Sequence, residues 1–335
     1  MLFCAILLAV FQEKVFTMVK VSVCVPVYGV EQFIERCACS LFGQTMREDI
    51  EFIFVDDRSP DNSIEILEKT LSRYPERKAQ TRIIRHESNQ GLVRARKTAL
   101  EAAAGEYIIH CDSDDWVEPQ TYQTLYDMAT TQNADIVCMS YSLDYDDAPK
   151  KSVHLPKLRK NSDPVQLLID CNLYWGVVFK LVRRSVALNS VTYAGDELCF
   201  GEDLLRSSQM LCAANKVVFC DDLFYHYYQG NRNSYTKTFK REFLDQLAVI
   251  ANWIDGNLPQ INTLSLKGDI IFHGTVRNLW RKNELKELFK GKHLGIVTYS
   301  GLHIVKRMVV LAAFISYPLT AKLCRLLFAR RYNLK

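Results

Sequence analysis

The sequence IIHCDSDD, at Ile108–Asp115, carries an apolar run directly into three closely spaced acids. The apolar part has the composition of a buried strand. Carboxylates this close repel one another unless a positive charge neutralises them. Because Mg²⁺ commonly takes one or two carboxylates together with substrate phosphates, the stretch predicts a metal site that holds a phosphorylated ligand. An acidic loop or helix cap is the alternative interpretation of an isolated Asp-x-Asp.

Strand-like and helix-like segments alternate strictly upstream of this stretch. Apolar, strand-like runs occur at 21–27, 51–55, 81–85 and 107–111. Segments with helical spacing lie between them, at 31–44, 64–74 and 92–104. The first run, VSVCVPV, is nearly all apolar and β-branched, as in strands buried on both faces of a parallel sheet. This alternation predicts an α/β domain with a mostly parallel sheet flanked by helices.

The second half of the chain has a less regular pattern. A helix is expected at 120–133, a strand at 134–139, a charged loop or lid at 144–163, a strand at 216–220 and helices from 242 to 289. Glu202 and Asp203 fall in the first turn of another expected helix, where acids also complement the helix dipole. The alternative interpretation of this acid pair is therefore helix capping alone.

Three of the expected strands end in residues suited to ligand binding. Pro26-Val27-Tyr28 ends the first strand, Asp56-Asp57 the second and Asp112–Asp114 the fourth. Ligands of open α/β sheets bind outside the carboxyl ends of the strands. The sequence has neither a Gly-x-Gly-x-x-Gly fingerprint nor a Walker loop, so a nucleotide would be bound through carboxylates and a metal rather than a glycine-rich loop.

The composition is that of a globular protein rather than a nucleic-acid-binding one. The 335 residues allow one large or two modest domains, and a net charge of +4 is too small to indicate nucleic acid as a partner. The 11 cysteines are odd in number, and several lie in apolar strand-like runs, which indicates a reducing compartment rather than a disulfide framework. Cys37-Ala-Cys39 has no second Cys/His pair with zinc-site spacing nearby.

The motifs, taken in order, resemble those of inverting family 2 glycosyltransferases with the Rossmann-like GT-A fold, of the bacterial polysaccharide type. They cover about residues 19–140 and, with a later Gly-Glu-Asp, extend to about 235. The matching positions are Val21–Tyr28, Val55–Ser59, Asn89-x-Gly91 with Ala95-Arg96, Gly105–Tyr107 leading into Asp112–Asp115, and Gly201–Asp203. Each motif is weak alone, but the ordered set is specific. The resemblance implies transfer from a nucleotide sugar, usually UDP-linked, with Mn²⁺ or Mg²⁺.

The resemblance also implies a role for each matching residue. The expected nucleotide-sugar contacts are Pro26, Val27, Tyr28, Asp57, Arg96, Asp112 and Ser113, with Asp57 on the uracil ring. The expected metal residues are Asp114, Asp112 and His226, with Asp112 near the ribose or metal and His226 near the metal and diphosphate. Asp203 would be the catalytic base and Glu202 would orient the acceptor. His226 has an alternative as a histidine packed in an aromatic cluster.

Three positions depart from the family's pattern. Gly29 stands where the family often has Asn, Arg58 where it often has Gly, and Lys97 where Asn is common. Arg58 is adjacent to the expected base-binding acids, so the identity of the donor stays open. The transferred sugar and the acceptor, a saccharide or a lipid-linked molecule, are not specified by any motif.

Two other functions compete with glycosyl transfer. A sugar nucleotidyltransferase would favour a glycine-rich basic loop after the first strand, and Tyr28–Glu31 matches this poorly. A non-catalytic sugar- or membrane-binding module would not require both Asp114 and Asp203.

The two ends of the chain predict accessory segments. Residues 1–17 form an expected N-terminal extension that can lie upstream of a true start at Met18, or a short membrane-touching segment. The GT-A catalytic domain is expected at 18–235, a helical region at 236–300, and a basic amphipathic segment at 301–335. No Asp or Glu follows Glu287, whereas Lys and Arg recur to the end. An apolar run with flanking cations predicts peripheral attachment to the inner face of the cell membrane, in the cytoplasm; a last helix packed on the catalytic domain is the alternative.

Overall fold

The computed structural model describes residues 19–155, 162–170, 173–190, 198–231, 240–280 and 284–328. The expectation for residues 1–17 lies outside this part of the chain. The chain divides into two compact units. The sheet unit comprises Met1–Val153, Val178–Asn189 and Cys220–Gln229, and the helical unit comprises His154–Val177, Ser190–Phe219 and Gly230–Lys335.

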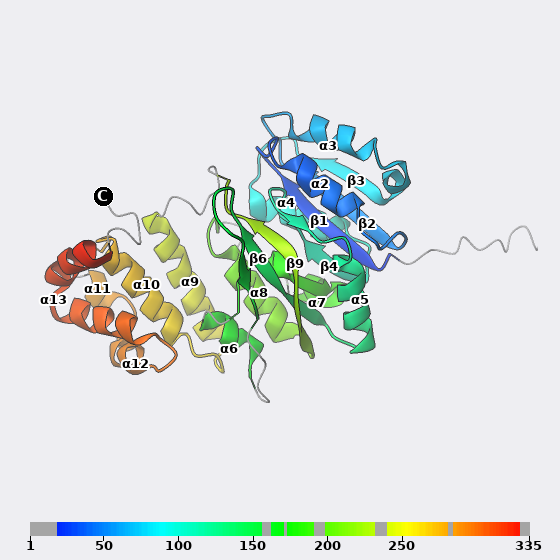
Figure 1. The fold of residues 1–335 in the computed structure, drawn as a ribbon. Helices are drawn as coiled ribbons and strands as arrows, with labels where there is room; N and C mark the ends of the chain where they lie inside the picture. Colours follow the sequence, from blue (N-terminus) through cyan, green and yellow to red (C-terminus); the bar gives the residue numbers. More distant parts are fainter. Residues whose placement is uncertain are drawn as a thin grey trace, which may run out of the picture. The chain divides into compact units, whose positions relative to one another are not determined.

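The sheet unit begins with the predicted parallel strands (Figure 1). They are β1 (Val21–Val27), β2 (Ile50–Asp56), β3 (Thr81–Arg85) and β4 (Tyr107–His110), in the spatial order β3-β2-β1-β4. All three neighbouring pairs are parallel. β1 and β2 are buried along their whole length, which accounts for their nearly continuous apolar sequences.

The helices of this half follow from the same alternation. They are α2 (Ile34–Phe42), α3 (Ser63–Leu71), α4 (Leu92–Ala102) and α5 (Thr121–Thr131), with the 3₁₀ segment η1 (Pro75–Gln80) before β3. The chain moves outward from β1 to β3 and then returns through α4 to β4 on the other side of β1. This reversal makes the carboxyl ends of β1 and β4 a topological switch point, where α/β sheets bind ligands.

The sheet extends beyond β4 and contains antiparallel pairs there. It continues through β8 (Lys180–Arg183), β6 (Ile136–Asp144), β9 (Val217–Tyr228) and β5 (Trp116–Val117), and β7 (Lys151–Val153) pairs with β6. A 3₁₀ turn, η2 (Val177–Phe179), precedes β8, and α7 (Arg184–Asn189) follows it. The α/β class with flanking helices is confirmed; β1 to β4 form the parallel pairs, and the pairs β4–β8, β6–β8, β6–β7 and β5–β9 are antiparallel.

Two local expectations in this half were wrong. Residues 151–153, expected within a loop or lid, form the edge strand β7; its polar composition concealed it because edge strands face water. The strand expected to end at Cys220 continues through the aromatic stretch to Tyr228 as β9. Asp221 and Asp222, which interrupt the apolar run, are exposed, so the strand tolerates them.

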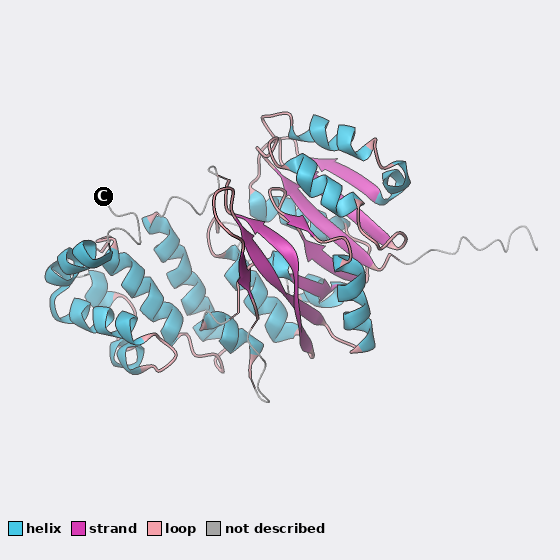
Figure 2. Cartoon of the chain, viewed as in Figure 1, coloured by secondary structure: helices cyan, strands magenta, loops and turns pink. Residues whose placement is uncertain are grey.

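The helical unit contains the helices expected after residue 242 (Figure 2). Its elements are α6 (Pro164–Ile169), α8 (Glu202–Ala213), α9 (Arg241–Asn257), α10 (Leu264–Val276), α11 (Glu284–Glu287), α12 (His293–Thr298) and α13 (Ile304–Phe328). α10 packs against α9, α12 and α13. Its buried apolar residues, including Leu266, Ile270 and Phe272, form the core of this unit.

A buried histidine in α10 makes the stability of the helical unit depend on pH. Burial, and then the positive charges of Arg277 and Lys306, lower the pKa of His273 to about 4. Arg277 Nη1 donates to His273 Nδ1 (3.0 Å), which requires this ring nitrogen to carry no proton. An unfolded histidine has a pKa near 6.5. The neutral ring therefore contributes stability above pH 6.5 that is lost as the pH falls towards 4.

We expect His273→Gln to flatten this part of the stability profile. The wild type should lose on the order of 3 kcal/mol of unfolding free energy from this site between pH 6.5 and 4. Urea unfolding at several pH values measures the slope, with His303→Gln, at an exposed position of the same unit, as the control. The assignment is wrong if His273→Gln and the wild type lose stability in parallel as the pH falls.

Candidate active site

A hydrogen-bond network joins the loops that follow β1 and β2. Asp61 Oδ1 accepts from the Ser59 hydroxyl (2.8 Å) and from Ser63 N–H (3.1 Å), and Oδ2 accepts from Glu31 N–H (3.0 Å). Burial alone would raise the pKa of Asp61, but the hydrogen bonds from Ser63, Glu31 and Ser59 outweigh it and lower the pKa. The Ser59 hydroxyl also accepts from Gly29 N–H (2.9 Å). The two loops are thus held as one rigid edge beside the strand ends.

Pro26, Val27 and Tyr28 lie at this edge as predicted. Pro26 and Val27 close β1 in register with Val55 and Asp56, and both are buried. Tyr28, the first residue beyond the strand, has 51% of its surface exposed. An exposed aromatic ring on a fixed loop is available to a planar ligand.

Asp57 lies beneath this edge rather than on its surface. Its Oδ1 accepts from Gln90 N–H (2.8 Å) and lies 2.7 Å from His86 Nδ1, and its Oδ2 accepts from Gly91 N–H (2.7 Å). Only 2% of the residue is exposed. Asp57 therefore holds the loop that starts α4, and its predicted contact with the uracil ring, which stays a prediction, would have to use the remaining acceptor capacity of these oxygens.

The two departures nearest the expected base site share a backbone conformation. Gly29 has φ +66° and Arg58 has φ +61°. Glycine and asparagine adopt this left-handed region most readily. This accounts for the asparagine that the family often has at position 29 and the glycine that it often has at position 58. Arg58 is exposed and has no hydrogen bond or ion pair with any residue in the described part of the chain.

The acidic stretch after β4 presents one carboxylate to a buried arginine. Arg96 Nη2 donates to Asp112 Oδ1 (2.8 Å), and Arg96 is 8% exposed. Ser113 is buried, whereas Asp112 and Asp114 are partly exposed. Arg36 Nη2 donates to the main-chain oxygen of Asp114 (2.9 Å). The structure pairs Arg96 with Asp112, a contact that the sequence analysis did not predict, and it adds Arg36 as a residue that holds the loop.

Asp115 has a structural role that sequence reasoning missed. It is fully buried; its Oδ2 accepts from the Tyr225 hydroxyl (2.7 Å) and its Oδ1 from Tyr228 N–H (2.8 Å). The Tyr225 oxygen in turn accepts from Asp112 N–H (3.1 Å). Burial, and then the charges of Asp114 and Asp112, raise the pKa of Asp115. Of the three acids, Asp115 ties the loop to β9, whereas Asp112 and Asp114 are partly exposed.

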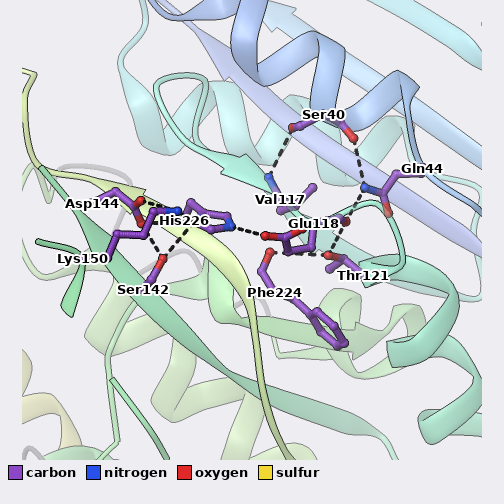
Figure 3. Close-up of polar contacts among 10 residues, drawn as sticks. All are labelled: Ser40, Gln44, Val117, Glu118, Thr121, Ser142, Asp144, Lys150, Phe224 and His226. Atoms are coloured by element: carbon purple, nitrogen blue, oxygen red, sulfur yellow. Dashed lines mark hydrogen bonds and ion pairs between the residues drawn. The ribbon is translucent and has the colours of Figure 1, made fainter. Parts of the chain in front are cut away.

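His226 lies at the centre of a second polar cluster, drawn in Figure 3. Its Nε2 is 2.9 Å from Glu118 Oε1 and its Nδ1 is 3.1 Å from Asp144 Oδ2. The ring stacks on Trp116, with centroids 4.9 Å apart and planes 4° apart, because the two residues are directly opposite in the β5–β9 pair. Both ring nitrogens already face carboxylates, so His226 as a metal ligand stays a prediction that requires one of these contacts to open.

The same cluster extends to α2 on the opposite face of Trp116. The guanidinium carbon of Arg36 lies 3.7 Å from the centre of the Trp116 ring. Lys150 pairs with Asp144 (3.0 Å). Burial alone would raise the pKa of Asp144, but hydrogen bonds from Ser142, Lys150 and His226 lower it. Arg36, Trp116 and His226 therefore form a stack that fixes the segment following the acids.

Glu202 and Asp203 lie in the helical unit, in the first turn of α8 as predicted. The turn is preceded by Gly201, which has φ +78°. A Cβ on Gly201 would lie 2.9 Å from Ile250 Cδ1 and 3.0 Å from Leu247 Cδ2 of α9. Glycine is therefore required here both by the backbone conformation and by close packing, and this fixes where α8 begins.

Gly201→Ala should destabilise the protein by about 1–2 kcal/mol from the left-handed backbone alone, and it should displace the acid pair. Urea unfolding and sugar-nucleotide turnover measure the two effects. Gly256→Ala is a matched control in α9, because its Cβ would meet no atom within 4 Å and alanine favours a helix interior. Equal stabilities of the two variants would show that the backbone conformation and packing at position 201 do not require glycine.

The described residues include no cluster of three His, Cys, Asp or Glu side chains that could hold a metal ion unaided. Mg²⁺ and Mn²⁺ are hard cations, and Mg²⁺ is commonly bound by one or two carboxylates plus substrate phosphates. Asp112 and Asp114 supply that donor set on one loop, with Asp112 Oδ1 already bound by Arg96. The residues present fit a metal that is completed by a diphosphate.

Comparisons with known proteins agree with this arrangement. The model of the family described as "Glycosyl transferase family 2" matches residues 22–186. Glycosyltransferase GlyG of Streptococcus pneumoniae serotype 4 is 34% identical over 220 residues, which are 62% of this chain and 70% of GlyG. The uncharacterized glycosyltransferase EpsJ of Bacillus subtilis strain 168 is 33% identical over 235 residues. That alignment spans 68% of this chain and 65% of EpsJ, just under two thirds of the relative's length.

Among solved structures, residues 1–349 of Staphylococcus aureus TarS have a similar fold. The TM-score is 0.66 with 17% sequence identity, and the match covers 94% of this chain and 92% of that one. It confirms the predicted GT-A fold with a helical C-terminal region. From its sequence relatives and its matching family model, the chain belongs to glycosyl transferase family 2.

Proposed function

We propose that the chain transfers a sugar, with inversion, from a UDP-linked donor to a hydroxyl group of a saccharide or lipid-linked acceptor. The observation that carries the proposal is the pair of partly exposed carboxylates, Asp112 and Asp114, at the switch point of the sheet. One of them is paired with the buried Arg96, and Asp115 holds their loop in place. Family membership sets the nucleotidyltransferase and the non-catalytic module aside.

Properties of two relatives support the UDP-linked donor and a role in cell-surface polysaccharide synthesis. TarS of S. aureus, named a poly(ribitol-phosphate) beta-N-acetylglucosaminyltransferase, is 25% identical over 239 residues. Its structure has been solved with UDP-GlcNAc and with UDP. A poly(ribitol-phosphate) beta-glucosyltransferase of Bacillus spizizenii is 37% identical over 119 residues. A hexose or N-acetylhexosamine is the corresponding proposal for the transferred sugar.

Each carboxylate has a separate task in the proposed reaction. Inversion is a single displacement at the anomeric carbon, through an oxocarbenium-like transition state. Asp203 would take the proton of the acceptor hydroxyl as that oxygen attacks, and Glu202 would orient the acceptor. Asp112 and Asp114 would hold a Mn²⁺ or Mg²⁺ ion, whose positive charge stabilises the departing diphosphate. Tyr28 and Arg58, both exposed at the ends of β1 and β2, would contact the nucleotide.

The test is release of UDP from a panel of UDP-sugars. The full chain is incubated with each donor in the presence of Mn²⁺, Mg²⁺ or a chelator, and GDP-sugars serve as the control. We expect slow hydrolysis of one or a few UDP-sugars that requires the divalent ion. Binding without UDP release from any donor in the panel, or turnover of GDP-sugars only, would contradict the proposal. The panel also identifies the sugar, which no motif specifies.

The proposed location is the cytoplasmic face of the cell membrane, where the enzyme would be peripheral. Nucleotide sugars are cytoplasmic substrates, and a lipid-linked acceptor would be embedded in the membrane. The sequence supports this location through the absence of Asp and Glu after Glu287. The surface that could contact lipid is argued separately below, from the structure of α13.

A further inference from the structure

The last helix of the described chain has two different apolar faces. One face of α13 is buried, and it packs on α10 and α12. Its buried residues are small or of medium size: Val310, Ala313, Thr320, Ala321 and Cys324. The other face carries the large side chains and is exposed: Ile304, Met308, Leu311, Ile315, Leu319, Leu323 and Leu326, called here the outer face of α13. Within each of the two segments, before and after the kink at Ser316, their three- and four-residue spacing places them on one side of the helix.

This distribution is the reverse of that in a helix that simply covers a globular core. Such a helix turns its large apolar residues inward and its polar residues outward. On the outer face, Ile315 is 79% exposed, Leu326 is 74% and Met308 is 64%. Exposed large apolar side chains gathered along both segments of one helix mark a site of protein or membrane interaction rather than chance exposure.

The charges around the outer face of α13 favour an anionic lipid surface as the occupant. α13 contains no acidic residue. Lys322 and Arg325 are exposed on its second half and form no ion pair with any described residue. At the first half, Lys306 is paired with Asp269 (2.7 Å) in α10. Cationic side chains beside an apolar stripe complement anionic headgroups above acyl chains, and each adds about 1 kcal/mol near such a surface.

The geometry of α13 favours a helix that lies on the membrane over one that crosses it. By length and composition alone, Ile304–Phe328 could span a bilayer. However, Ser316 has non-helical angles (φ −149°, ψ 90°) and Pro318 follows it. The segment before the kink, Ile304–Ile315, is about 18 Å long at 1.5 Å per residue. The hydrocarbon core is about 30 Å thick, and one side of the helix is already packed against protein.

We propose that the outer face of α13 is a membrane-docking surface that inserts shallowly into an anionic bilayer, with the helix parallel to the membrane plane. The small-residue face keeps the helix packed on α10 and α12 while the large side chains enter the headgroup region. The kink divides the helix into two short segments, so that it does not form a single spanning rod. This inference rests on the helix alone and does not require the proposed reaction.

The experiment is co-sedimentation of the full chain with vesicles of phosphatidylcholine, with and without phosphatidylglycerol. Leu311→Glu combined with Ile315→Glu should lower binding to the anionic vesicles at least tenfold. Lys322→Ala combined with Arg325→Ala should remove most of the preference for anionic vesicles. Val249→Glu is the matched control, because Val249 is an apolar residue of α9 with 59% exposure outside the outer face of α13, and it should bind like the wild type. Circular dichroism confirms that each variant is folded.

Three outcomes would overturn the proposal. The first is a wild-type chain that does not sediment with either vesicle. The second is binding by the Leu311/Ile315 variant that equals that of the wild type. The third is a stable wild-type oligomer that shows no vesicle binding and that the same double substitution dissociates, because the outer face would then be an interface between copies of the chain. Analytical ultracentrifugation of the same samples measures the third outcome.

Discussion

Asp203→Asn should lower sugar transfer by about 10²- to 10⁴-fold, the usual contribution of a general base, while donor binding is kept. Asparagine has nearly the shape of aspartate but cannot accept the proton of the acceptor hydroxyl. The left-handed Gly201 fixes the start of α8, so the substitution should not move the helix. The kinetic signature is a loss in kcat with an unchanged KM for the donor.

The matched control for Asp203 is Glu242→Gln. Glu242 is also an acid in the first turn of a helix, α9 of the same unit. If acids at these positions only complement the helix dipole, each substitution should cost about 0.3–1 kcal/mol of stability and leave turnover unchanged. If Asp203→Asn has the same turnover as Glu242→Gln, then Glu202 and Asp203 only complement the dipole of α8 and have no catalytic role. Glu202→Gln separates the two neighbours, because a residue that orients the acceptor should mainly raise the acceptor KM.

The parallel half of the fold could be predicted because its signals are local. β1 and β2 are buried on both faces, so their sequences are continuous apolar runs that can hardly be anything else. The turn residues that follow them mark the strand ends, and topology then brings those ends together. For this reason the positions of Tyr28, Asp57 and Asp112, just beyond the ends of neighbouring parallel strands, followed from the sequence pattern.

The antiparallel half of the sheet, and the residues that hold the acidic loop in place, depend on contacts between residues that are distant in the sequence. Trp116 stacks on His226 and Asp115 accepts from Tyr228, across more than a hundred residues of chain. The hydrophobic periodicity of a sequence does not predict contacts between residues so far apart. Arg36 appears in the sequence as an ordinary exposed helical residue, and only the structure shows it against Trp116 and the Asp114 carbonyl. The tryptophan directly after the acids was the one signal that could have suggested a fixed loop.

The same distinction explains α13. The sequence shows an apolar, basic helix, which suits both a packed helix and a membrane-bound one. Which side chains are buried is decided by the neighbouring helices α10 and α12, and these select the small residues. The structure shows a packed inner face and an exposed outer one, and attachment of the outer face to a membrane stays a prediction.

Asp114→Ala should abolish the dependence of donor binding on a divalent ion. Asp114 is partly exposed on the loop after β4, and its main-chain oxygen is held by Arg36 independently of its carboxylate. The alanine variant should thus keep the loop in place and lose only the charge. Loss of even an outer partner of a metal ligand costs about 10- to 100-fold in affinity, so UDP binding with Mn²⁺ should weaken at least tenfold.

Calorimetric titration of UDP, with Mn²⁺ and with a chelator, tests this without requiring turnover. Asp127→Ala is the control, because Asp127 is an exposed acid of α5 in the same unit and its loss changes the net charge equally. Two results together would show that the Asp114 carboxylate acts by binding the metal rather than through the net charge of the protein. The control must bind UDP like the wild type, and Asp114→Ala must bind UDP equally with and without Mn²⁺. An Asp114→Ala chain that keeps the full Mn²⁺ effect would assign the metal to other residues. Asp112 would be the first candidate, because Arg96 holds only one of its two oxygens in the described contacts.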